Sequence, residues 1–97
     1  MEIKTTAVAG TLESSDIQIM ISKGSNGIEI DLESEVEKAY GDQIRKVITE
    51  TLEKYGLKNA KVKATDKGAH DCVIKARTLA AAQHATETQY KPDLEVL

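Results

Sequence analysis

The sequence contains no phenylalanine, no tryptophan and only three tyrosines among its 97 residues. Any core must therefore be built from isoleucine, valine, leucine and alanine. Lysine and arginine number 13 against 16 acidic residues, which gives a net charge of −3. Nucleic-acid-binding domains usually carry a basic stripe and aromatic side chains that stack on bases. This chain has neither feature, so we expect no nucleic acid partner.

Cysteine and long apolar runs are equally scarce. The single cysteine, Cys72, cannot form an internal disulfide, which fits a reducing compartment. The first ten residues lack the apolar stretch of a signal peptide. No segment approaches the ~20 apolar residues that a membrane-spanning helix needs. We expect one cytoplasmic domain with no membrane partner.

The clearest periodic patterns are two runs of alternating apolar and polar residues. They cover residues 17–22 and 28–33, and the period of two is typical of half-buried strands. The glycine- and asparagine-containing residues 23–27 between them form a turn. The sequence therefore predicts an antiparallel hairpin. A short edge strand within residues 1–12 is more weakly indicated.

A helix is predicted over residues 34–55, where apolar side chains recur at spacings of three and four. Ser34 and Glu37 have the spacing of a capping box at its start. Gly41 leaves open whether this helix is continuous, kinked or split. Gly56 marks its end, because glycine accepts the left-handed conformation that follows a helix C-terminus.

The remaining pattern gives one more strand and one more helix. Residues 60–65 alternate, with two lysines on one face that would oppose the acidic 28–33 strand if the two are neighbours. Asp71 is a suitable N-cap for a helix through about residue 85, since the alanine-rich part favours helix strongly. A strand over residues 72–76 is the competing interpretation.

These elements predict an α+β fold. The expected architecture is a two-layer sandwich in which a small, mostly antiparallel sheet carries two helices on one face. Residues 1–85 would form the domain. Residues 86–97 are polar, contain the only proline and show no period, so we expect a flexible C-terminal tail.

The stretch of greatest functional interest is residues 7–16, with the sequence AVAGTLESSD. Ser14 and Ser15 lie between Glu13 and Asp16, and nothing nearby in sequence could activate either hydroxyl as a nucleophile. This favours a serine that receives a group over one that attacks a substrate. The two acids either mark the site for a basic enzyme surface or are simply solvated charges. Without other information, a plain solvated loop is the more common meaning of such a stretch.

Other reactive side chains do not form a recognisable site. His70, Asp71 and Cys72 are consecutive, so on a helix they point in different directions and do not converge on one atom. His84 is the only other histidine, which makes a metal site improbable. The phosphate-binding pattern Gly-x4-Gly-Lys-Ser/Thr is absent. We therefore expect no catalytic residue and no metal in this chain.

Three blocks of sequence together resemble one family. AVAGTLESSD, VEKAYGDQIRKVI and DKGAHDCVIKAR occur in the order and spacing of the citrate lyase acyl carrier (gamma) subunits, and the resemblance covers about residues 1–85. In that family the first serine of a Glu-Ser-Ser/Gly-Asp segment carries a prosthetic group, which implies Ser14 here. Ser15 is the rival position. The implied group is 2'-(5''-phosphoribosyl)-3'-dephospho-coenzyme A, joined to the serine through a phosphodiester.

The resemblance also implies a function. The chain would be a non-catalytic subunit, and a phosphoprotein, that carries acetyl and citryl thioesters in citrate fermentation. Its partners would be the alpha (transferase) and beta (lyase) subunits of citrate lyase and a dedicated prosthetic-group transferase. Two alternatives remain: the carrier subunit of malonate decarboxylase, and an α+β interaction module with no covalent group. The Asp-Ser-Leu attachment motif of four-helix acyl carriers is absent.

Overall fold

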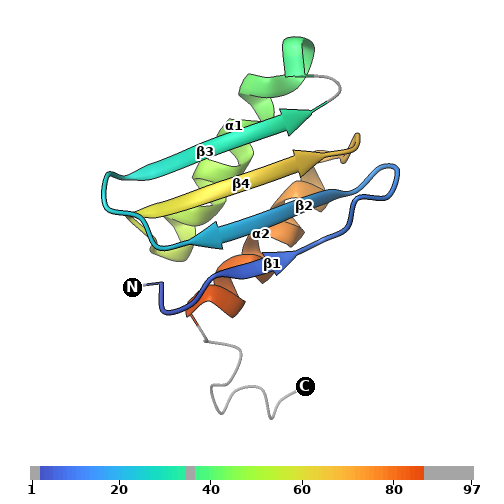
Figure 1. Cartoon of the computed structure of the whole chain (residues 1–97). Helices are drawn as coiled ribbons and strands as arrows, with labels where there is room; N and C mark the ends of the chain where they lie inside the picture. The colour runs from blue at the N-terminus through green and yellow to red at the C-terminus, as the bar shows by residue number, and fades with distance from the viewer. Residues whose placement is uncertain (1–2, 35–36, 87–97) are drawn as a thin grey trace.

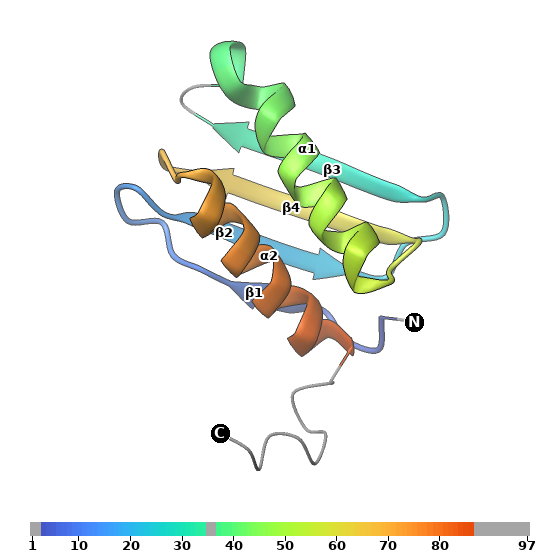
Figure 2. The same ribbon diagram turned by 180° about the vertical axis from the view of Figure 1, so that it is seen from behind.

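A computed structural model describes residues 3–34 and 37–86 of the chain, the side chains of residues 37–39 excepted. Its strands form one sheet in the order β1-β2-β4-β3. Figures 1 and 2 show both helices packed on the same face of that sheet. The elements are β1 (Ala7–Ala9), β2 (Ile17–Ser22), β3 (Ile28–Ser34), α1 (Glu37–Tyr55), β4 (Ala60–Asp66) and α2 (Asp71–Thr86). The predicted α+β two-layer sandwich is confirmed.

The core lies between the sheet and the helices, and alternation along the strands builds it. Ile17, Ile19 and Ile21 of β2 are completely buried, while the side chains between them face the other side. In β4 the inward positions include Ala60 and Ala64, also completely buried. These small side chains let the helices lie close to the sheet, so aliphatic residues fill the core without any phenylalanine or tryptophan.

The predicted hairpin is wrong in its pairing. β2 and β3 run in opposite directions, but β4 lies between them, antiparallel to β2 and parallel to β3. In this register Glu29 of β3 faces Lys61 of β4, and Asp31 faces Lys63, as expected if these strands are neighbours. Opposite charges on paired strands each add a fraction of a kcal/mol. The charge pattern therefore favours β4 over β2 as the partner of β3.

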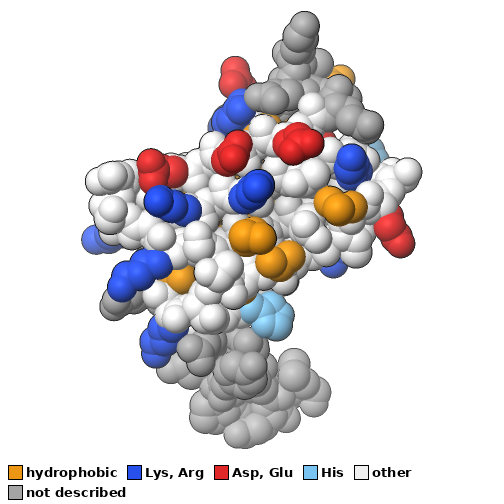
Figure 3. Space-filling view, in the orientation of Figure 1, with side chains coloured by type: hydrophobic (Ala, Val, Ile, Leu, Met, Phe, Trp, Pro, Cys, Tyr) orange, Lys and Arg blue, Asp and Glu red, His pale blue; other side chains and the backbone are white. Residues whose placement is uncertain are grey.

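The sheet face opposite the helices is open to solvent in the described part of the chain (Figure 3). Val8 and Met20 face each other across β1 and β2 and are 45% and 38% exposed. Charged side chains cover the half of the face that β3 and β4 form (Figure 3). Antiparallel sheets commonly keep one solvated face of this kind.

Helix α1 runs without a break through Gly41, which answers the question that the sequence left open. It ends as predicted at Gly56, whose φ of +105° suits glycine. The amides of Gly56 and Leu57 both donate to the carbonyl of Leu52, at 3.1 and 3.0 Å. This pairing satisfies carbonyl groups that the helix end would otherwise leave free.

The start of α1 is only partly described. Ser34 is the last residue of β3, and its hydroxyl donates to the carboxylate of Asp66 at 2.9 Å. The predicted capping box also needs the side chain of Glu37, which lies outside the described side chains.

Helix α2 confirms the second predicted helix and excludes a strand over residues 72–76. Its N-cap is one residue earlier than predicted. The carbonyl of His70 accepts hydrogen bonds from the amides of Val73 and Ile74, both at 3.0 Å, while Asp71 lies in the first turn. Thr86, the first residue of the predicted 86–97 tail, is instead the buried last residue of α2, and the rest of that tail lies outside the described residues. Neither described helix has the length and apolar character required to cross a bilayer.

Candidate functional site

The serine-containing loop, residues 10–16, connects β1 to β2 at one end of the sheet. The connection from β4 to α2 lies at the same end (Figure 1). Two backbone hydrogen bonds join these segments: the amide of Ser15 donates to the carbonyl of Lys67 at 2.7 Å, and the amide of Lys67 donates to the carbonyl of Asp16 at 2.9 Å. The first sequence block, residues 7–16, and the third, residues 66–77, are therefore held side by side.

Asp16 fixes the loop through its carboxylate. One oxygen, Oδ1, accepts from the amide of Ile17 at 2.7 Å and from Nε of Arg77 at 3.0 Å. The other, Oδ2, accepts from Nη2 of Arg77 at 3.1 Å and from the hydroxyl of Thr11 at 2.6 Å. A two-point contact between guanidinium and carboxylate is strong and directional. Arg77 on α2 thus anchors the loop from the other end of the sequence.

These contacts change the acid–base properties of the pair. Hydrogen bonds from Arg77 and then from Thr11 hold the pKa of Asp16 well below its ordinary value of 3.8, although burial opposes them. The hydrogen bond to Asp16 likewise raises the pKa of Arg77. The sequence left open whether Glu13 and Asp16 are simply solvated charges. For Asp16 this interpretation is wrong, because its side chain is buried. Glu13 is exposed, as the interpretation requires.

The lowered pKa of Asp16 predicts a pH dependence of stability. A carboxyl group whose pKa is depressed in the folded state stabilises the fold above its unfolded pKa and loses this contribution as the pH falls through the folded value. We therefore expect the free energy of unfolding to fall below about pH 4. Urea unfolding between pH 6 and pH 2 measures this, and Asp16→Asn should flatten the acid limb. An acid limb unchanged by Asp16→Asn would contradict the prediction.

Asp16→Asn also removes the charge from the contact with Arg77 at neutral pH. We expect a loss of about 2 kcal/mol in unfolding free energy, the scale of hydrogen bonds to charged groups. Asp42→Asn is the matched control, because Asp42 is fully exposed and only 3.9 Å from Arg45 in an i,i+3 pair. Exposed pairs of this kind contribute little. Equal unfolding midpoints for the two variants would contradict the role assigned to Asp16.

Ser14 and Ser15 form the corner of a turn. The amide of Asp16 donates to the carbonyl of Glu13 at 3.2 Å, which makes Ser14 and Ser15 the two central residues. Ser15 has a φ of +65°, the left-handed value required at the third position of a type II turn. Both serines are exposed, and the hydroxyl of Ser14 makes no hydrogen bond to any described residue. The Ser14 hydroxyl is therefore accessible on a backbone that is fixed on both sides.

The other side chains that the sequence singled out are dispersed. Asp71 accepts from the side-chain amide of Gln43 at 2.9 Å, and Cys72 is exposed. Within residues 3–34 and 40–86, no three histidine, cysteine, aspartate or glutamate side chains gather where a metal ion could bind. The contact of Asp71 with Gln43 brings the second sequence block to the same end of the fold as the other two.

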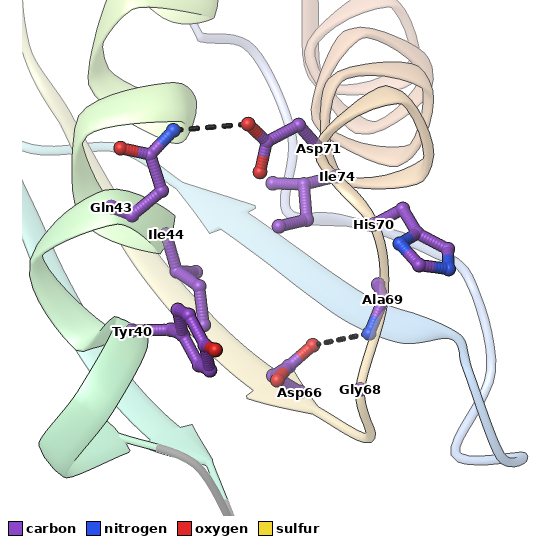
Figure 4. Close-up of a pocket in the computed structure, with 9 residues that line it drawn as sticks. All are labelled: Tyr40, Gln43, Ile44, Asp66, Gly68, Ala69, His70, Asp71 and Ile74. Carbon is purple, nitrogen blue, oxygen red and sulfur yellow. Dashed lines mark hydrogen bonds between the residues drawn. The ribbon is translucent and has the colours of Figure 1, made fainter.

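A pocket of about 500 Å³, the α1–α2 pocket, lies where these blocks meet. Figure 4 shows its walls converging from the two helices and from the segment that follows β4. Its lining residues are Tyr40, Gln43 and Ile44 of α1, Asp66 at the end of β4, Gly68, Ala69 and His70 of the connection, and Asp71 and Ile74 of α2.

Sequence patterns missed Arg77 and Asp66 as parts of this end of the molecule. The helical pattern alone does not distinguish Arg77 from the other residues on its side of the second helix. A cation on the apolar side of a helix needs a carboxylate partner, and that requirement was the available signal. Asp66 is 1% exposed, and its carboxylate supports the turn that follows β4 by accepting from the amide of Ala69 at 3.0 Å.

Comparisons with known proteins place the chain in a family. A family model described as malonate decarboxylase delta subunit (MdcD) matches residues 4–85. The chain has the fold of a chain in a crystal structure of a Pseudomonas malonate decarboxylase hetero-tetramer in complex with malonate. The TM-score is 0.68 at 16% identity, over 91% of this chain and 87% of that one. At this identity the likeness concerns the fold alone.

Curated relatives are far more similar in sequence. The citrate lyase acyl carrier protein of Lactobacillus helveticus is 92% identical over the full length of both chains. The proteins of the same name from Lactobacillus acidophilus and Lactiplantibacillus plantarum are 88% and 67% identical, again over the full length of both chains. The chain belongs to the citrate lyase acyl carrier protein family.

Proposed function

We propose that this chain is the acyl carrier subunit of citrate lyase and that Ser14 carries the covalent 2'-(5''-phosphoribosyl)-3'-dephospho-coenzyme A arm. The observation that carries the proposal is the exposed Ser14 hydroxyl on a turn whose backbone is fixed by neighbours. Membership of an acyl carrier protein family supports a carried prosthetic group. When attached, the arm provides a thiol that can form thioesters.

The residues around Ser14 suit a group joined through a phosphodiester. The hydroxyl is exposed at a corner, where a bulky substituent meets little of the fold. The nearest buried acid, Asp16, is already matched by Arg77, so its charge does not act alone on an added phosphate. Lys67, whose backbone pairs with the loop, adds a cationic side chain to the neighbouring segment.

The turn favours Ser14 over Ser15 as the attachment position. Ser15 needs a left-handed backbone, which glycine adopts most readily. This accounts for the Ser/Gly choice at the second position of the family's segment, and a position that glycine can fill cannot carry the arm. Ser14 does not have a left-handed backbone, so the turn itself gives no reason for glycine at this position. The feature that a serine adds there is its hydroxyl group.

The chain contributes no catalytic group in this proposal. It holds the attachment point on a rigid sandwich, and tethering keeps the arm's end at high local concentration near the active sites of other subunits. Those subunits are the alpha (transferase) and beta (lyase) chains, with a dedicated transferase that loads the arm in the cytoplasm. Residues 1–85 would act as the carrier domain and residues 86–97 as a flexible tail.

Reconstitution of the complex tests this function. Purified alpha and beta subunits are assayed for citrate cleavage with no carrier, with the bare chain and with the chain after arm loading. We expect cleavage only with the loaded chain. Activity of the loaded chain with malonate decarboxylase subunits, and none with citrate lyase subunits, would favour the malonate decarboxylase carrier instead, which the family model's description makes the second candidate. No activity with either set would leave an interaction module.

A further inference from the structure

We propose that the α1–α2 pocket binds the thiol end of the arm while that end is neutral, and releases it when the attached acyl group bears free carboxylates. The inference rests on the proposed function, since the arm must first be attached at Ser14. It adds a second task to the fold: besides presenting the arm, the chain would discriminate between its chemical states.

The pocket adjoins the attachment loop. The amide of Ser15 donates to the carbonyl of Lys67 at 2.7 Å, and the next residue, Gly68, already lines the pocket. The attachment point at Ser14 is therefore close to the chain segment that lines the pocket. Tethering at such short range gives an effective concentration in the millimolar range, so weak intrinsic binding is enough to fill the pocket.

The pocket walls suit the aliphatic parts of such an arm. Ile44 of α1 and Ile74 of α2 are buried and face each other across the pocket (Figure 4). Tyr40 stands at the rim with 60% of its surface exposed, although tyrosine is a large and partly apolar residue. Covering Tyr40 with the methyl and methylene groups of the arm would remove apolar surface from water.

The carboxylate of Asp66 lines the pocket and has acceptor sites that the described residues do not fill. Its carboxylate is 1% exposed and accepts from the hydroxyl of Ser34 and the amide of Ala69, the two contacts made by described residues. A carboxylate has about four acceptor sites, so about two remain. Buried acceptors favour donors, and the arm of coenzyme A carries two amide N–H groups and a hydroxyl.

The charge of the pocket sets its selectivity. Asp66 and Asp71 are both acidic, and the described residues that line the pocket include no lysine or arginine. A neutral thiol or acetyl end meets no repulsion there. An acyl group with free carboxylates, such as citryl, would place like charges within a few ångströms of two others. The neutral end of the arm would thus be held in the pocket, away from water, and the anionic end would be available to a partner subunit.

A pair of caps that differ only in charge tests this. The Cys72→Ser chain is loaded with the arm, so that the arm holds the only thiol. Alkylation with iodoacetamide gives a neutral cap, and alkylation with iodoacetate gives an anionic cap of nearly the same shape. Methyl NMR then follows Ile44 and Ile74 in the pocket, with Ile28, which lines a separate surface hollow, as the internal control.

With the neutral cap we expect the methyl signals of Ile44 and Ile74 to shift from their positions in the bare chain while Ile28 stays. With the anionic cap, both signals should lie close to their positions in the bare chain. One added negative charge near two others should lower the occupancy of the pocket by the arm roughly fivefold to tenfold. Asp71→Asn should narrow the difference between the caps. Asp42→Asn, which changes an exposed charge outside the pocket lining, should leave it unchanged.

Two results would overturn the inference, and a third would contradict the function on which it rests. Unmoved Ile44 and Ile74 signals in a chain shown by mass to be loaded would exclude binding in the pocket, and the proposed carrier function would stand. Equal shifts with both caps would exclude selection by charge. An unchanged mass after the loading reaction would instead contradict the proposed function itself.

Discussion

Ser14→Ala is expected to abolish citrate cleavage by the reconstituted complex, whereas Ser15→Ala is expected to retain it. The reason is that the hydroxyl of Ser14 is the only atom at that position to which a phosphodiester can be joined. The backbone contacts of the turn use main-chain groups, namely the amides of Ser15 and Asp16, so neither substitution removes them. The measurement is citrate consumption after both variants pass through the same loading reaction.

Ser15→Ala is the control for this prediction because the two serines share one turn and are both exposed. Circular dichroism and urea unfolding should show that both variants are folded, since each loses only an exposed hydroxyl group. Full activity of Ser14→Ala together with loss of activity in Ser15→Ala would keep the carrier function and move the arm to Ser15. Full activity of both variants would contradict covalent attachment at this turn.

Gly10→Ala is expected to destabilise the fold strongly. A Cβ atom at Gly10 would overlap the carbonyl oxygen of Ile17 and lie 2.9 Å from its carbonyl carbon. Both are backbone atoms, so no side-chain rotation relieves the clash, and the loop would have to move away from β2. We expect a loss of at least about 3 kcal/mol in unfolding free energy, the combined scale of overpacking and an unfavourable backbone conformation.

Gly68→Ala separates the clash from the backbone conformation. Gly68 has a φ of +92°, almost the same as the +91° of Gly10, but a Cβ there would have no heavy atom within 4 Å. Gly68→Ala should therefore cost only about 1 kcal/mol, the left-handed backbone penalty. Urea unfolding of both variants gives the comparison. Similar losses would mean that the loop accommodates the added carbon and is not tightly fixed against β2.

Local pattern was enough to predict most elements of this fold. The alternation at 17–22 and 60–65 predicted β2 and β4, because residues two apart share one face of a strand. Helical spacing and the glycine at position 56 predicted most of α1 and its end, but the predicted start at Ser34 falls in β3. The strand order was not predicted, since pairing depends on contacts between distant segments. The chain passes from β3 through α1 before it returns as β4, and β4 then lies between β2 and β3.

The attachment loop shows the same division between local and distant information. Ser14 and its exposure were expected from the composition of the loop, and the structure describes it as exposed. What holds the loop was not expected, because Asp16 and Arg77 are 61 residues apart in the chain. No periodicity links two such positions. The ion pair forms because the fold brings the β1–β2 loop against the middle of α2, where Arg77 lies.

The intact mass of this chain after co-expression with the prosthetic-group transferase, followed by peptide mapping, is the most direct measurement of the carrier role. We expect one added phosphoribosyl-dephospho-coenzyme A, found on the peptide that contains Ser14 and assigned to that residue by fragmentation. An unchanged mass, obtained with a transferase shown to load a known citrate lyase carrier, would contradict it.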